Sequence, residues 1–119
     1  MKSGIAICHG TGFHLKFENG WVLSVQCGPG MYCEHHNDAL TAFTLAPTEP
    51  RLWESKDAEI AVWNSGIEEH KMVDLGSDSV KGWVTVSDLA KVIGVVYELK
   101  PETTNEEASS LLVALGLEH

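Results

Sequence analysis

Alternating apolar and polar positions between residues 13 and 27 are the strongest structural signal in this chain. In "GFHLKFENGWVLSVQC" every second residue is apolar on both sides of an Asn-Gly pair, which is typical of two strands joined by a tight turn. A two-residue loop would put the two apolar sets on opposite faces of the hairpin. A three-residue loop, Glu18 to Gly20, pairs Phe17 with Trp21 and brings both sets to one face. We therefore predict a hairpin with the longer loop. Its apolar face is predicted to comprise Phe13, Leu15, Phe17, Leu23 and Val25.

A second hairpin is predicted around "AEIAVWNSGIEEHKMVDL", with a loop at residues 64–66. A three-residue loop there would place Trp63 opposite Ile67. The return strand carries several charged residues, which is typical of an edge strand that resists aggregation. A further short strand is predicted at residues 79–84, and the stretch "IAIC" near the start of the chain also has strand character.

The hydrophobic period changes from two to that of a helix after residue 84. Thr85 and Asp88, and later Thr104 and Glu107, have the spacing of N-terminal helix caps. The first predicted helix ends before a proline and the second ends at a glycine. The first helix should cover the hairpin face with a stripe of Leu89, Val92, Ile93 and Val96. The stripe of the second helix comprises Ala108, Leu111, Leu112 and Leu115.

These elements predict an α+β fold, in which an antiparallel sheet built from β-hairpins carries two C-terminal helices on one face. The chain has 119 residues and a mass of 13.0 kDa, which suits a single domain. We assign that domain to residues 1–116. Residues 117–119, "LEH", resemble the beginning of a vector-encoded purification tag and are left out of the functional argument.

The net charge of the chain disfavours some classes of binding partner. Seventeen acidic and eight basic residues give a formal net charge of -9, which repels nucleic-acid phosphates and anionic membrane surfaces. A basic protein or a cation fits this charge better. The acidic residues are spread along the chain, which favours a soluble monomer. The start of the sequence lacks the apolar core of a signal peptide, and three cysteines do not suggest a disulfide framework, so we expect a cytoplasmic protein.

The stretch "CGPGMYCEHH" gathers the residue types that bind zinc. Cys27, Cys33, His35 and His36 could supply a tetrahedral set of sulfur and nitrogen ligands around a Gly-Pro-Gly turn. Their spacing differs from that of the usual zinc knuckles, and adjacent histidines point apart in an extended chain. The competing interpretation is an ordinary turn, in which the cysteines pack as small apolar residues and the histidines face water.

Two further hypotheses involve the same region. Cys33 could act as a nucleophile with His35 or His36 as its base, although no local signature of a cysteine enzyme accompanies them. The segment from residue 28 to residue 57 is long for a connection in a compact domain, and such segments are often functional. It carries Phe43 and Trp53, which we expect to contact a protein partner.

Three segments, "FENGWVLSVQCGPGMYC", "DAEIAVWNSG" and "VKGWVTVSDLAKVI", resemble in this order a family of small bacteriophage- and prophage-encoded proteins of unassigned activity. The resemblance spans roughly residues 12 to 96. It implies an accessory protein of a mobile element in the cytoplasm of a bacterial host, and it assigns no reaction or functional residue. We predict a non-enzymatic module that binds a host or phage protein. The alternatives are a zinc-binding protein and a small cysteine-dependent enzyme.

Overall fold

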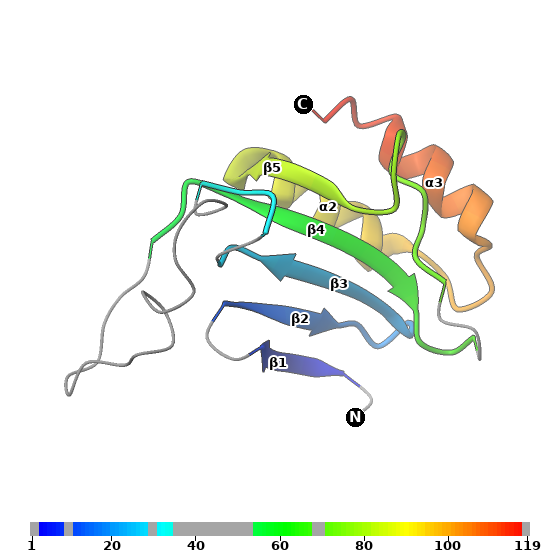
Figure 1. The fold of residues 1–119 in the computed structure, drawn as a ribbon. Coiled ribbons are helices and arrows are strands. Elements are labelled where there is room, and N and C mark those ends of the chain that lie inside the picture. The colour runs from blue at the N-terminus through cyan, green and yellow to red at the C-terminus, as the bar shows by residue number, and fades with distance from the viewer. Residues whose placement is uncertain (1–2, 9–10, 29–30, 35–53, 68–70, 118–119) are drawn as a thin grey trace.

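The computed structural model describes residues 3–8, 11–28, 31–34, 54–67 and 71–117. Within these residues, five antiparallel strands form one sheet in the order β1-β2-β3-β4-β5, and two helices follow them in the chain (Figure 1). The strands are β1 Gly4–Cys8, β2 Gly12–Lys16, β3 Trp21–Gln26, β4 Asp57–Asn64 and β5 Lys81–Thr85. The helices are α2 Val86–Glu98 and α3 Asn105–Val113. The predicted α+β class is confirmed, and β5 is the short strand predicted at residues 79–84.

The first hairpin has the predicted register. The Phe17 N–H donates to the Trp21 carbonyl oxygen at 2.9 Å, and Leu15 lies opposite Leu23. Gly20 closes the loop with a φ of 90°, a backbone conformation that a residue with a Cβ rarely adopts. The alternation of apolar residues and the glycine therefore select the same three-residue loop.

Both helices begin at the predicted threonines. The Thr85 hydroxyl accepts from the Asp88 N–H at 3.3 Å, which caps α2. At α3 the Thr104 hydroxyl accepts from the Glu107 N–H at 3.1 Å, and the Glu107 carboxylate accepts from the Thr104 N–H at 3.1 Å. These bonds satisfy backbone donors that have no partner within the helix, so the local sequence fixes where each helix starts.

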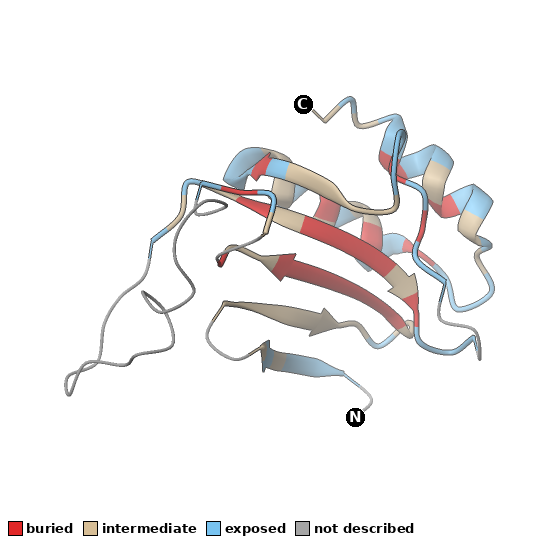
Figure 2. Cartoon of the chain, viewed as in Figure 1, coloured by how far each residue is buried: buried red, intermediate tan, exposed pale blue. Residues whose placement is uncertain are grey.

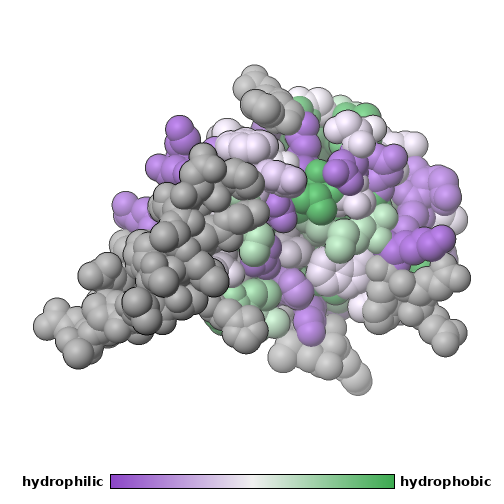
Figure 3. Space-filling model, viewed as in Figure 1, coloured by the Kyte–Doolittle hydropathy of each residue, from purple (hydrophilic) through white to green (hydrophobic). Residues whose placement is uncertain are grey.

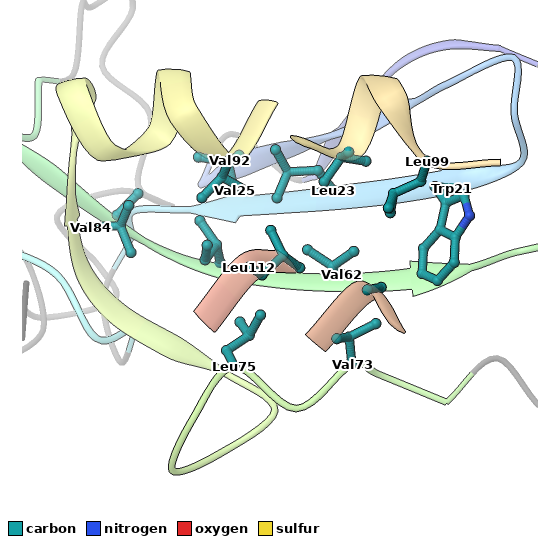
Figure 4. Close-up of a cluster of buried hydrophobic side chains, with 14 residues drawn as sticks. Trp21, Leu23, Val25, Val62, Val73, Leu75, Val84, Val92, Leu99 and Leu112 are labelled. Atoms are coloured by element: carbon teal, nitrogen blue, oxygen red, sulfur yellow. The ribbon is translucent and has the colours of Figure 1, made fainter. Parts of the chain in front are cut away.

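The hydrophobic core lies between the sheet and the helices, and Figure 4 shows its side chains. Trp21, Leu23 and Val62 are all fully buried in it, facing Val92 and Val96 of α2. The members of the predicted helix stripe beside these two valines are only partly buried. α3 contributes Ala108 and Leu112, whereas Leu111 is 51% exposed and does not share the buried face with these two members of its predicted stripe. The buried face of this short helix is therefore narrower than the number of its apolar residues suggests.

Burial decreases across the sheet from β3 and β4 toward β1, as Figure 2 shows. α2 packs over β3 and β5, so the β2 side of the sheet carries less cover. Phe13, Leu15 and Phe17 lie on the predicted face but are only partly buried. The expectation of one wholly buried face is therefore correct for β3 and wrong for β2. The sheet is wider than one helix can cover because β1 extends it.

The predicted second hairpin has the wrong register. Trp63 bridges Met72 rather than Ile67, and the Val73 N–H donates to the Val62 carbonyl oxygen at 2.8 Å. The longer connection brings Val73, which is fully buried, into the core. The predicted three-residue loop would instead have placed the charged return segment beside β4, so apolar burial further along the chain decides the register.

The opposite face of the sheet carries a histidine that should make stability depend on pH. The His14 ring packs edge-on against the Trp63 ring, with centroids 5.1 Å apart and an interplanar angle of 85°. Burial, and then the charge of Lys16, lower the pKa of His14 below its usual 6.5. Because the folded chain releases this proton more readily, His14 contributes its full stability above pH 6.5 and progressively less as the pH falls from there toward the folded pKa.

We predict that His14→Gln reduces the loss of unfolding free energy between about pH 7.5 and about pH 5. Urea denaturation of both proteins at the two pH values provides the measurement. Equal losses of unfolding free energy in the two proteins would contradict a depressed pKa at His14.

Figure 3 shows hydrophobic residues near the centre of one face of the molecule with hydrophilic residues around them.

Candidate functional site

A hollow of about 750 Å³ lies where the sheet meets the beginning of α2. We call it the α2 pocket. Its apolar lining comes from four strands and the helix, namely Phe13, Val25, Cys27, Ala58, Val84, Val86 and Leu89. Its polar lining comes from two short segments, namely Glu34 and residues 54–57. A hollow with apolar walls and a few polar groups is a candidate binding site.

Hydrogen bonds hold the polar side of the pocket together. The Glu34 N–H donates to the Asp57 carboxylate at 2.7 Å, and the Lys56 N–H donates to the Glu34 carboxylate at 2.7 Å. The Ser55 hydroxyl donates to the Asp57 carbonyl oxygen at 2.7 Å. Glu34 and residues 54–57 lie within the predicted contact segment 28–57, so two parts of that segment line the pocket.

The charge of this lining is negative. Glu34, Glu54 and Asp57 supply three carboxylates against the one ammonium group of Lys56, which leaves a net charge of -2. The pocket therefore combines apolar walls with an acidic side, in a chain whose formal net charge is -9. A ligand that is both apolar and cationic would match both features.

An exposed aromatic pair joins the segment that precedes Glu34 to β5. The rings of Tyr32 and Trp83 stack with centroids 5.6 Å apart, and they are 46% and 38% exposed. The Trp83 N–H donates to the Tyr32 carbonyl oxygen at 2.8 Å, and a Cβ on Gly82 would approach the Tyr32 Cβ to 2.5 Å. Only glycine allows this close approach.

Trp83 has a φ of 51°, which is unusual for a bulky residue and typical of backbone strain at functional positions. The sequence predicts Trp83 as an ordinary residue of the short strand at residues 79–84. The sequence therefore did not single out the aromatic pair.

Two of the predicted metal ligands, Cys27 and Cys33, have different surroundings in the structure. Cys27 lines the α2 pocket, and burial raises the pKa of its thiol. Cys33 is 1% exposed, and its Sγ donates to the Gly28 carbonyl oxygen at 3.7 Å. A buried, hydrogen-bonded thiol is typical of structural cysteine, which argues against Cys33 as a nucleophile.

The other predicted site residues, His35, His36, Phe43 and Trp53, lie outside the described residues. Within the described ranges, no group of three or more His, Cys, Asp or Glu side chains is placed to hold a metal ion. Zinc binding through the Cys27 to His36 stretch stays a prediction, as does partner binding through Phe43 and Trp53.

Comparisons with known proteins give no relative: no family model, no curated protein and no solved structure matches the chain. The resemblance to small phage and prophage proteins therefore stays a prediction. In the part of the chain that the structure describes, neither helix has the length and apolar character needed to cross a membrane.

Proposed function

We propose that this protein is a non-enzymatic binding module whose α2 pocket receives an apolar side chain from a basic segment of another protein. The observation that carries the proposal is the pairing of apolar walls with an acidic side in one hollow of about 750 Å³. Following the family resemblance, we place the partner among the proteins of a bacteriophage or its bacterial host.

Each feature of the pocket has a separate role in this proposal. Burying one leucine or phenylalanine side chain against the apolar walls contributes roughly 1.5–3 kcal/mol. The carboxylates select for lysine or arginine beside that side chain and accelerate the encounter, more than they add affinity. Glu34 and residues 54–57 line the same pocket, and they lie within the segment 28–57 that we predict to contact the partner.

The proposal predicts that peptide binding depends on both apolar character and charge. The probe is a short peptide with one central leucine flanked by lysines, and its match has glutamates in place of the lysines. In amide chemical-shift titrations, the lysine peptide should shift residues of the α2 pocket, while the glutamate peptide should not. Added salt should weaken the binding because it screens the carboxylates.

A pocket-filling variant provides the control. Val86 lines the pocket and is 72% exposed, so Val86→Trp should occupy the hollow without disturbing the core. This variant should reduce binding of the lysine peptide at least tenfold while its melting temperature stays close to that of the parent. Equal binding of the two peptides, or unchanged binding by Val86→Trp, would refute the proposed site.

A further inference from the structure

Within the residues that the structure describes, β1 is the first strand in the sheet order, so one of its edges pairs with β2 and its outer edge pairs with no described strand. The backbone hydrogen-bonding groups of this outer edge have no partner among those residues. Two bonds fix which residues of β2 face β3: the Phe17 N–H donates to Trp21, and the Thr11 carbonyl oxygen accepts from Cys27 at 2.8 Å. Backbone groups alternate along an antiparallel strand, so the odd-numbered residues of this segment face β3.

The even-numbered residues of β2 therefore face β1, and His14 pairs with Ala6. By the same alternation, the N–H and C=O groups of Ile5 and Ile7 point away from the sheet. An edge with free donors and acceptors is a template for a further strand.

The side chains on this edge are apolar and exposed. Ile5 is 63% exposed and Ile7 is 74% exposed. They lie opposite Leu15 and Phe13, on the face of the sheet where α2 packs. α2 packs over β3 and β5, so this end of the face carries two exposed isoleucines beside partly buried residues of β2 (Figure 2).

β1 lacks the features that protect edge strands. Its sequence, GIAIC, contains no charged residue and no proline, and its pairing with β2 has no bulge. Natural sheets commonly place lysine, proline or a bulge at such an edge to prevent pairing with another chain. An unprotected, neutral edge with exposed isoleucines is the pattern of a strand that pairs.

We propose that two copies of this chain associate through antiparallel pairing of their β1 strands, about a two-fold axis at Ala6. In this register Ile5 lies opposite the partner's Ile7, so the outward N–H and C=O groups of both residues are used. The four isoleucines then gather on the helix-bearing face, and the two sheets become continuous. The pairing is symmetric because the two residues of β1 whose backbone groups point away from the sheet, Ile5 and Ile7, are both isoleucines.

Charge distinguishes a second copy from a different partner. Each chain carries a formal net charge of -9, which by itself favours a monomer, while β1 is neutral. Screening should therefore strengthen association between two copies, because salt weakens their long-range repulsion and leaves backbone pairing unchanged. Association with a basic partner would weaken under the same conditions.

The test is the solution mass of the chain with any tag removed, measured over about 1 µM to 1 mM, the range of weak to moderate interfaces. We expect the mass to approach twice 13.0 kDa as concentration rises, and to do so at lower concentration in higher salt. Ile7→Lys should keep the protein monomeric. Val113→Lys adds the same charge at a 47% exposed apolar residue of α3 and should leave association unchanged.

A cross-linking experiment tests the register. In a Cys8→Ser background, Ala6→Cys places two cysteines in a non-hydrogen-bonded pair, whose Cα atoms lie about 4.5 Å apart, a separation that a disulfide spans. Ser3→Cys places them about 20 Å apart, because each is six strand positions from its copy. We expect a covalent dimer from Ala6→Cys and little from Ser3→Cys.

Three outcomes would overturn the proposal: a monomer at every concentration, a dimer that survives Ile7→Lys, or cross-linking that is as efficient at residue 3 as at residue 6. The circular dichroism spectrum of each variant should match that of the parent, since both isoleucines are exposed. Peptide binding at the α2 pocket is measured separately, so failure of one proposal does not decide the other.

Discussion

Trp21→Ala is expected to remove about 3–5 kcal/mol from the free energy of unfolding, which is the usual cost of deleting a buried tryptophan side chain. Trp21 is fully buried at one end of the core (Figure 4), and its Nε1–H donates to the Lys100 carbonyl oxygen at 2.9 Å. The substitution therefore leaves a cavity and removes one of two hydrogen bonds to the Lys100 carbonyl oxygen, which also accepts from the Thr103 N–H at 3.0 Å. Since domains are stable by only about 5–15 kcal/mol, the variant should unfold at much lower urea concentration.

Two matched variants divide this effect into its parts. Trp21→Phe keeps most of the apolar volume and loses the hydrogen bond, so it should cost less than alanine. Trp83→Ala removes the same side chain from a position that is 38% exposed, and it should also cost less. Equal losses for Trp21→Ala and Trp83→Ala would show that Trp21 does not anchor the core.

Asn19→Asp should destabilise the fold more than Asn19→Ala at neutral pH. The Asn19 Nδ2 donates to the carbonyl oxygens of Val96 at 2.9 Å and Leu99 at 2.7 Å, where α2 ends. Its Oδ1 accepts from the Trp21 N–H at 3.0 Å. Losing these bonds in the alanine variant should cost about 1–3 kcal/mol. A carboxylate adds repulsion from the carbonyl oxygens and from the negative end of the helix dipole.

Protonation should partly restore the aspartate variant. The helix end should raise the pKa of the introduced carboxyl group in the folded chain, so the folded state binds more protons and stability increases as the pH falls. Urea denaturation should show a smaller difference in unfolding free energy between the aspartate and alanine variants at about pH 4.5 than at about pH 7. A gap that is constant with pH, or no gap at neutral pH, would mean that Asn19 does not cap α2.

The elements that were predicted correctly have strong local signals. Gly20 and the alternation around it specify the first hairpin, and the threonine caps specify where both helices begin. The errors occur where distant parts of the chain compete for burial. Val73 takes the place beside β4 that the local pattern gave to a nearer residue, and Leu111 stays exposed because α3 packs through Leu112.

The α2 pocket could not be predicted from the sequence because its lining comes from residues far apart in the chain, from Phe13 to Leu89. Of the two predicted site residues that the structure describes, Cys27 lines it and Cys33 does not, and nothing around Cys27 in the sequence indicates a pocket. The capping role of Asn19 was hidden for a similar reason, because the carbonyl oxygens that it contacts lie about eighty positions further along the chain. In the sequence, Asn19 and Gly20 are already explained as turn residues, so nothing there indicates a contact with a distant helix.

The hydrogen bonds between Glu34, Lys56 and Asp57 have a consequence for the chain that joins them. Closing a loop costs entropy because its two ends must meet, and here the folded sheet already holds them together. The pairing of Glu34 with Lys56 and Asp57 therefore fixes, side by side, the two points between which the intervening chain runs.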